Sequence, residues 1–174
     1  MREWVPVSTS PKGRLVLAAV AAFGARGFDE VTVGELSSAA EVTTGALYHH
    51  FGSKLGLYEF VRADIERRLL DRMEGAAAAS GPDAATAVRS ALLVGFDFAV
   101  GERFLRILEE PPAGADGDRL AEVLGSATDS PVLGRVLSAA WRAALAAIAD
   151  GADPKLARAA INALEIHLPP HAER

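Results

Sequence analysis

The chain of 174 residues contains no cysteine, and aromatic side chains make up only 6% of it. Without cysteine there can be no disulfide framework and no thiol chemistry, which is compatible with a reducing cytoplasm. The chain also lacks an excess of basic residues, because 18 Lys and Arg stand against 23 Asp and Glu. This acidic balance argues against tight non-specific binding to nucleic acid, which needs many cationic contacts to phosphate.

Long uninterrupted apolar runs are also absent. The stretch 15–25 follows Arg14 much as the hydrophobic region of a secretory signal follows its basic residue. The stretch is rich in alanine and far shorter than the roughly 20 residues that span a membrane. Its spacing instead favours a helix that Ser10 caps and Gly27 ends. We therefore predict neither a signal peptide nor a membrane partner.

Residues 28–54 begin with the pattern of a short capped helix. Thr32 and Glu35 have the spacing of a capping box, in which each side chain accepts a hydrogen bond from the other residue's backbone. Val42 would then lie buried in the turn that follows. The apolar face of this helix is predicted to consist of Leu36, Ala39 and Ala40.

A second short helix is predicted directly after the turn. Thr43 is a good N-cap, and Leu47 and Phe51, four residues apart, would face the core. The opposite side would carry small or hydrogen-bonding groups, which suit entry into a DNA major groove. These groups are Thr44, Gly45, Ala46, Tyr48 and His49. The alternative is an ordinary helical hairpin whose caps serve only the local core.

In this region the sequence resembles the tetracycline-repressor-like (TetR-like) family of transcriptional regulators. The resemblance starts at Arg14, continues through 27–33, and ends in the run 45–54, so that it covers about the first third of the chain. It implies an arm and helix-turn-helix DNA-binding domain over residues 1–52. An effector-binding and dimerisation domain would occupy residues 53–174.

The resemblance also assigns roles to single residues. It implies that Tyr48 and Lys54 touch backbone phosphates. The other DNA-binding positions that it implies, at or beside the groove, are Thr43, Thr44, Gly45, Ala46, His49 and His50. Thr32, at the start of the first short helix, is also predicted to bind DNA. Two positions depart from the family pattern: Gly34 replaces a polar or basic residue, and Glu41 replaces the glycine of the turn. A positive φ at Glu41 would cost about 1 to 2 kcal/mol.

The rest of the chain also reads as helices. Apolar residues at steps of three and four predict one long helix from Ser53 to about Ala79, with Arg62 and Glu66 on its charged far side. Further helices are predicted over 83–101, 104–109, 118–126, 130–150 and from Asp153 to near His167. The expected fold is all-α with about nine helices, three in the head and six in the body.

The last two helices are rich in alanine on more than one face. Small side chains let helices approach closely, so a second apolar face suggests packing against a copy of the chain. The alternative is a surface that uses alanine for its helix propensity alone. The resemblance favours an interface, because the family's last two helices form the dimer's four-helix bundle. The proposed interface residues are Val136, Ala140, Ala144, Ile148, Ala157, Ala160, Ile161 and Leu164.

Large apolar side chains in the body could form either solid core or the wall of a ligand pocket. The residues in question are Met73, Leu92, Phe96, Phe104, Leu108 and Trp141. The resemblance implies a small-molecule effector pocket between the long helix and its neighbours, but it does not identify the effector. The residues themselves leave both alternatives open.

These observations predict a cytoplasmic, homodimeric, ligand-responsive regulator. We expect a repressor that a small-molecule effector releases from a palindromic double-stranded DNA operator. An enzyme is disfavoured, because the sequence shows no Ser/His/Asp set, phosphate loop or metal cluster, and we predict no cofactor. Adjacent His49 and His50 point about 100° apart on a helix and cannot share a metal as residues four apart would. The alternative is a helical homodimeric interaction protein with a non-functional DNA-binding head.

Overall fold

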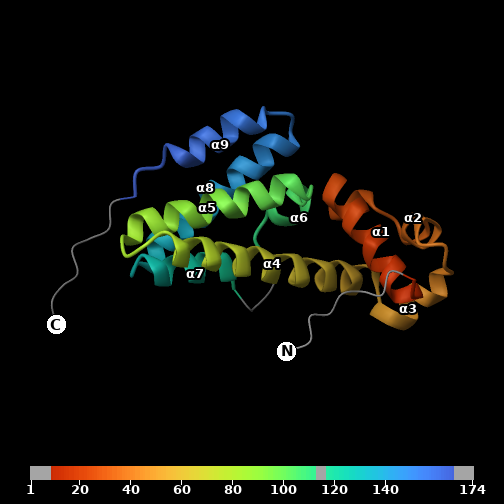
Figure 1. Ribbon diagram of the computed structural model, residues 1–174. Helices are drawn as coiled ribbons and strands as arrows, with labels where there is room; N and C mark the ends of the chain where they lie inside the picture. The colour runs from red at the N-terminus through yellow and green to blue at the C-terminus, as the bar shows by residue number, and fades with distance from the viewer. Residues whose placement is uncertain (1–8, 113–116, 167–174) are drawn as a thin grey trace. The chain divides into compact units, whose positions relative to one another are not determined.

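The computed structural model describes residues 9–112 and 117–166. Within these ranges the chain forms nine α-helices and no β-strand (Figure 1). The all-α class with about nine helices is therefore confirmed. The helices are α1 (Pro11–Ala25), α2 (Val33–Ala39), α3 (Thr44–Phe51), α4 (Lys54–Ala79), α5 (Ala84–Gly101), α6 (Leu105–Leu108), α7 (Arg119–Ala127), α8 (Pro131–Ala149) and α9 (Pro154–Asn162), with a 3₁₀ turn η1 (Phe28–Glu30).

The chain divides into two compact units, Met1–Glu66 and Arg67–Arg174. We call the first unit the head and the second the body. Helices α1 to α3 belong to the head and α5 to α9 to the body, while α4 contributes residues to each. The boundary between the two packed units lies inside α4. The predicted boundary between the DNA-binding and effector-binding domains lies after residue 52, just before α4 begins.

The head is built around three short helices. Ser10 caps α1 by accepting the N–H of Gly13 at 3.0 Å, as the sequence predicts. Leu15 from α1 and Leu47 from α3 are completely buried, and Leu36 from α2 is nearly so. The ring of Phe23 extends this core, with the ring centroids of Phe28 and Tyr58 at 5.9 and 5.1 Å.

Two details of the predicted burial are wrong. Ala39 is exposed, and Ser37 takes its place in the interior of α2. Arg62 and Glu66 are buried at 7% exposure each, although they were expected on the charged side of the long helix. Each follows directly after a residue of the buried apolar stripe on α4. The buried face of α4 is therefore wider than the apolar residues alone indicate. The stripe consists of Leu57, Val61, Ile65, Leu69 and Met73.

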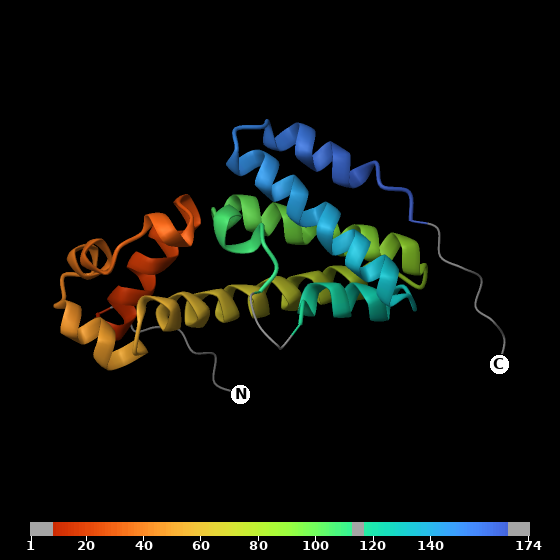
Figure 2. The same ribbon diagram turned by 180° about the vertical axis from the view of Figure 1, so that it is seen from behind.

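Helix α8 is the centre of the body. It packs against α5, α6, α7 and α9, and it lies beside α9 in both views (Figures 1 and 2). Trp141 is fully buried, and its indole Nε1–H donates to the carbonyl oxygen of Leu92 on α5 at 3.1 Å. The crossing with α7 is close, because a Cβ on Gly134 would lie 2.3 Å from the carbonyl oxygen of Ala121.

Helix α9 is shorter than predicted. It ends at Asn162, so Leu164 lies beyond it, and His167 lies outside the described residues. The N-terminal arm predicted over 1–9 also lies outside them, except for Thr9. The N–H of Leu164 turns back to the carbonyl oxygen of Ile161 at 3.2 Å. Leaving the helix here allows Ile166 to be buried at 8% exposure.

Two body helices, α5 and α8, are long and apolar enough to cross a membrane by length and composition alone. Each also supplies core side chains to the body, including Phe96 of α5 and Leu145 of α8. Helix α8 further supplies the buried guanidinium of Arg142, which forms an ion pair with the half-buried Asp118. These contacts favour core helices of a helical body over membrane spans.

Candidate DNA-binding surface and body cavities

Helix α2 begins with the predicted capping box. The hydroxyl of Thr32 accepts the N–H of Glu35 at 3.2 Å, and the Glu35 carboxylate accepts the N–H of Thr32 at 2.8 Å. Arg26 adds an ion pair to the same carboxylate at 3.0 Å. The backbone N–H of Thr32, followed by the Arg26 guanidinium and the Thr32 hydroxyl, lowers the pKa of Glu35 to about 2.

The turn between α2 and α3 has the conformation that the family pattern requires. Glu41 adopts a φ of 53°, in the left-handed region that glycine would adopt without strain. Arg14 supports the turn from α1, because its Nε donates to the carbonyl oxygen of Ala40 at 2.8 Å. Val42 is half-buried rather than fully buried, and its N–H donates to the carbonyl oxygen of Ser37 at 3.0 Å.

Helix α3 is anchored on one side and open on the other. Thr43 caps it as predicted, accepting the N–H of Ala46 at 3.3 Å, and Leu47 is fully buried. Tyr48 is 53% exposed, and Ala46 is half-buried. The remaining predicted DNA-binding residues of this segment are all exposed, namely Thr43, Thr44, Gly45, His49 and His50.

Lys54 has structural contacts that its sequence position did not reveal. Its Nζ donates to the carbonyl oxygens of Phe28 and Val31, each at 2.9 Å, and lies 4.0 Å from the centroid of the Phe28 ring. Two of the three N–H donors of this ammonium group are thus used within the head. Contact between Lys54 and phosphate stays a prediction, with at most one donor left for it.

No group of three or more His, Asp or Glu side chains in the described part of the chain is arranged to hold a metal ion. The two adjacent histidines of α3, His49 and His50, have ring centroids 5.1 Å apart in an edge-to-face arrangement. Both histidines are exposed, together with the N-terminal turn of α3. The surface therefore offers hydrogen-bonding side chains, including two imidazoles, to a partner.

The body contains a cavity between α4, α5 and α7, which we call the α5 cavity. Its volume is about 250 Å³, and its wall is almost entirely apolar. Met73 is its one residue from the predicted effector set, and Glu74 is its one charged residue. The full lining is Met73, Glu74, Ala77, Ala84, Ala87, Val88, Ala91, Val123, Leu124 and Ala127.

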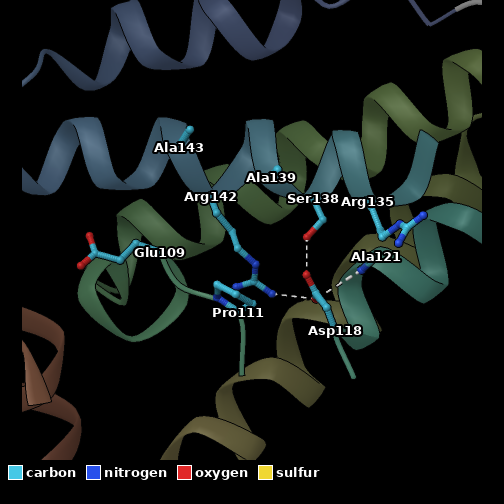
Figure 3. Close-up of a pocket in the computed structure, with 9 residues that line it drawn as sticks. All are labelled: Glu109, Pro111, Asp118, Ala121, Arg135, Ser138, Ala139, Arg142 and Ala143. Carbon is cyan, nitrogen blue, oxygen red and sulfur yellow. Dashed lines mark hydrogen bonds and ion pairs between the residues drawn. The ribbon is translucent and has the colours of Figure 1, made fainter. Parts of the chain in front are cut away.

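A second cavity of about 370 Å³ lies between α7 and α8, and we call it the α8 cavity (Figure 3). A cluster of paired polar groups forms part of its wall: Arg142 donates to Asp118 at 2.8 Å and to the carbonyl oxygens of Leu108 and Glu110, at 2.6 and 2.9 Å. Ser138 donates to the other oxygen of Asp118 at 2.7 Å (Figure 3). This cluster joins α6, α7 and α8.

The other predicted effector residues lie in the interior of the body, but they line neither cavity. Phe96, Leu92, Leu108 and Trp141 are 1% exposed or less, and Phe104 is 5% exposed. The indole of Trp141 is also held by its hydrogen bond to the carbonyl oxygen of Leu92. With so little exposed surface, these side chains form packed core around α8. Sequence spacing could not separate core from pocket here, because both need apolar residues on the inner faces of the same helices.

The predicted interface residues fall into two groups. Ala157 and Ile161 are buried in the body of their own chain, at 8% and 2% exposure. Val136 is 57% exposed, and Ala160 is also exposed. The remaining four are half-buried: Ala140, Ala144, Ile148 and Leu164. Two exposed apolar residues of α8 and α9 were missing from the prediction, Val132 at 61% and Leu156 at 70% exposure.

The fold and the exposed capped helix α3 define an all-α protein with a helix-turn-helix domain. Residues 15–61 match the family model of bacterial regulatory proteins of the tetR family. The match covers α1 to α3 and the beginning of α4. The resemblance to this family seen in the sequence is therefore confirmed for residues 15–61.

Solved structures extend the likeness to the body. A TetR-like transcriptional regulator from Rhodococcus sp. RHA1 is 21% identical with a TM-score of 0.69, over 91% of this chain and 94% of that chain. The TetR family repressor AlkX from Dietzia sp. strain DQ12-45-1b is 16% identical with a TM-score of 0.48, over 88% and 92% of the two chains. The likeness in fold to the Rhodococcus structure extends over 91% of this chain and so includes helices of the body.

Proposed function

We propose that this chain is a homodimeric transcriptional repressor that binds a palindromic double-stranded DNA operator and is released from it by a small-molecule effector. The observation that carries the proposal is helix α3, which is capped by Thr43, anchored by Leu47 and open to solvent inside the segment that matches the tetR family. Such a protein acts in the cytoplasm, where its operator lies, and it needs no catalytic site.

DNA recognition would use the N-terminal half of α3. The unpaired N–H groups at this end of the helix attract phosphate, and the hydroxyls of Thr44 and Tyr48 are exposed beside them. Gly45 has no side chain and lets the helix approach the groove closely. In the proposed contact set, Lys54 would add one N–H donor and also hold the loop at Phe28 and Val31.

Dimerisation would use the outer faces of α8 and α9. Val132, Val136 and Leu156 are large apolar side chains with more than half of their surface exposed. Ala160 lies on the exposed side of α9, so α9 can approach a second copy closely. A two-fold interface of this kind would place two copies of α3 on the two halves of a palindrome.

Effector binding is best supported at the α5 cavity. Its apolar wall suits a small, largely apolar molecule, and Glu74 could accept a hydrogen bond from one polar group of that molecule. The cavity joins the body half of α4 to α5 and α7, and α4 continues from there into the head. A ligand that binds one geometry of this helix more tightly would shift the population of dimers and change operator affinity.

Selection of bound DNA from random duplexes at near-physiological salt tests the proposal. The expected result is a palindrome whose half-site centres lie about one helical turn, or a multiple of it, apart. Binding should weaken as salt concentration increases. Selected DNA without two-fold symmetry would contradict a dimeric reader, and no selection at all would favour the helical interaction protein instead.

The effector site needs its own test. Ala87→Leu would fill part of the α5 cavity, while Ala78→Leu adds the same bulk at an exposed position of α4 that does not line it. We expect A87L to retain operator binding and its melting temperature but to lose stabilisation by apolar fragments that stabilise the wild type. A78L should respond to the fragments as the wild type does. A lower melting temperature for A87L would mean that the added side chain overpacks a solid core and that no ligand cavity is present there.

A further inference from the structure

The head contains few cations, and each described one has a partner inside the head. Lys12 lies over the rings of Phe51 and Phe60, at 5.7 and 4.9 Å from their centroids. Arg26 pairs with Glu35 at 3.0 Å. The other three bind oxygen atoms: Arg14 at the carbonyls of Thr9 and Ala40, Lys54 at those of Phe28 and Val31, and Arg62 at the Tyr58 hydroxyl.

These partners limit how the head can neutralise DNA phosphate. A cation that turns fully toward DNA gives up its ring, carboxylate or carbonyl partner, and Lys54 can keep its two carbonyl partners only by offering phosphate a single N–H donor. Asp and Glu also outnumber Lys and Arg in the head, eight to six over residues 1–66. A further source of positive charge would therefore strengthen binding to phosphate beyond what the helix N–H groups and hydroxyls supply.

His49 and His50 provide such a source on α3 itself. Both are exposed, and each consecutive residue of a helix turns by about 100°, which places His49 about 200° from the buried Leu47. His49 thus points away from the core of the head, on the same side as Gly45. Histidine is the side chain whose charge ordinarily changes between pH 5 and 8.

We propose that operator binding by this chain is coupled to the protonation of His49 and His50, whose imidazolium forms bind the DNA backbone. The inference rests on the proposed DNA-binding function and assigns a charge state to two of its contact residues. A histidine that binds DNA better when protonated strengthens binding at low pH. This contribution is lost as the pH rises through the pKa of that histidine in the complex.

The other charged groups near α3 are carboxylates, ammonium groups and guanidinium groups. Helices α1, α2 and α4 and the turn before α3 surround it, and Asp29 and Glu30 lie in the loop that Lys54 holds. Glu35 stays ionised, because its pKa is lowered to about 2. Within the head, the charged side chains on these surrounding elements are Lys12, Arg14, Glu35, Glu41, Lys54, Glu59, Arg62, Asp64 and Glu66. Asp, Glu, Lys and Arg change charge ordinarily outside pH 6 to 8.

The test measures operator affinity at pH 6, 7 and 8 over a series of salt concentrations, with the full-length dimer and the selected palindrome. The wild type should bind about sixfold more tightly at pH 6 than at pH 8 for each histidine that gains one unit of proton affinity in the complex, because part of a one-unit effect falls outside this pH range. The dependence of log affinity on log salt should become steeper at pH 6, by about 0.9 for each histidine that contacts phosphate.

Two variants identify the source of the effect. His49→Gln/His50→Gln should bind with the same affinity at pH 6 and pH 8 and should keep its melting temperature. The control, His171→Gln, changes a histidine of the C-terminal tail and should keep the full pH dependence. Wild-type affinity that does not vary with pH, or a pH dependence that survives in the double variant, overturns the proton coupling and leaves the proposed function intact. Absence of selective binding at every pH overturns both.

Discussion

At the scale of single residues, Glu41 shows how this head departs from its family pattern. Its φ of 53° places a side chain where glycine would be free of strain. Glu41→Gly should stabilise the head by about 0.5 to 1 kcal/mol, because the left-handed strain exceeds the extra chain entropy of glycine. Glu41→Ala keeps the Cβ and should give no such gain. Urea unfolding measures the free energy of unfolding of both variants. If the two variants are equally stable, the change in stability comes from the loss of the carboxylate and not from the removal of the Cβ.

Lys54 leads to a second residue-scale prediction. Lys54→Met keeps most of the side-chain length but leaves the carbonyl oxygens of Phe28 and Val31 without their donor. The free energy of unfolding should fall by about 1 to 3 kcal/mol, as for other buried groups that lose a partner. The salt dependence of DNA binding should change by less than the roughly 0.9 expected for one full phosphate contact. If the unfolding curve is unchanged and the salt dependence of DNA binding falls by the full value of about 0.9, Lys54 contacts phosphate and does not stabilise the head.

At the scale of helices, the starts were predictable because the signals are local. Ser10, Thr32, Thr43 and Asp83 each cap a helix through a backbone N–H only two or three residues away. The contacts of Lys54, by contrast, join residues more than 20 positions apart, and no spacing rule indicates them. The end of α9 was also missed, because the burial of Ile166 depends on the tertiary packing of the body.

The crossing of α7 and α8 depends on two glycines, Gly125 and Gly134. A Cβ on Gly134 would lie within 2.5 Å of backbone atoms of Gly125 and of the Ala121 carbonyl oxygen. Gly134→Ala should therefore force the helices apart and destabilise the body by about 1 to 3 kcal/mol. Gly75→Ala is the matched control, because a Cβ there meets nothing within 4 Å and should stabilise α4 by about 0.5 to 1 kcal/mol. Melting curves that fall for both variants would contradict the close approach.

The ion pair of Arg142 with Asp118 gives the body a dependence on pH. Burial raises the pKa of Asp118, but hydrogen bonds from Arg142 and Ser138 outweigh burial, so the pKa is lowered overall. The lowered value means that Asp118 stabilises the fold above its unfolded pKa, about 3.9, and loses this effect as pH falls through the folded value. Asp118→Asn should be about 3 kcal/mol less stable at pH 7. This deficit should shrink below about pH 4, and a constant deficit would exclude the charge as its cause.

For the molecule as a whole, the sequence supported the fold class and the DNA-reading helix better than the body's surfaces. Helix α3 could be predicted because its caps, its buried Leu47 and its open face all lie within nine residues. The positions of the dimer interface and of the cavities depend on which apolar helix faces pack inside the body of the same chain. Ile161 and Leu156 are both apolar residues of α9, yet Ile161 is 2% exposed and Leu156 is 70% exposed. Only the packed body separates them.

That difference allows the dimer to be tested without unfolding the chain. Leu156→Asp places a charge at an exposed site of a single chain but inside the proposed interface, so the dimer should dissociate while the helical content remains. Leu17→Asp is the control, since Leu17 is an exposed leucine of the head at 50% exposure and should leave the dimer unchanged. Ile161→Asp should unfold the body at any concentration. Sedimentation velocity combined with circular dichroism separates these cases, and a dimer that survives L156D would move the interface away from α9.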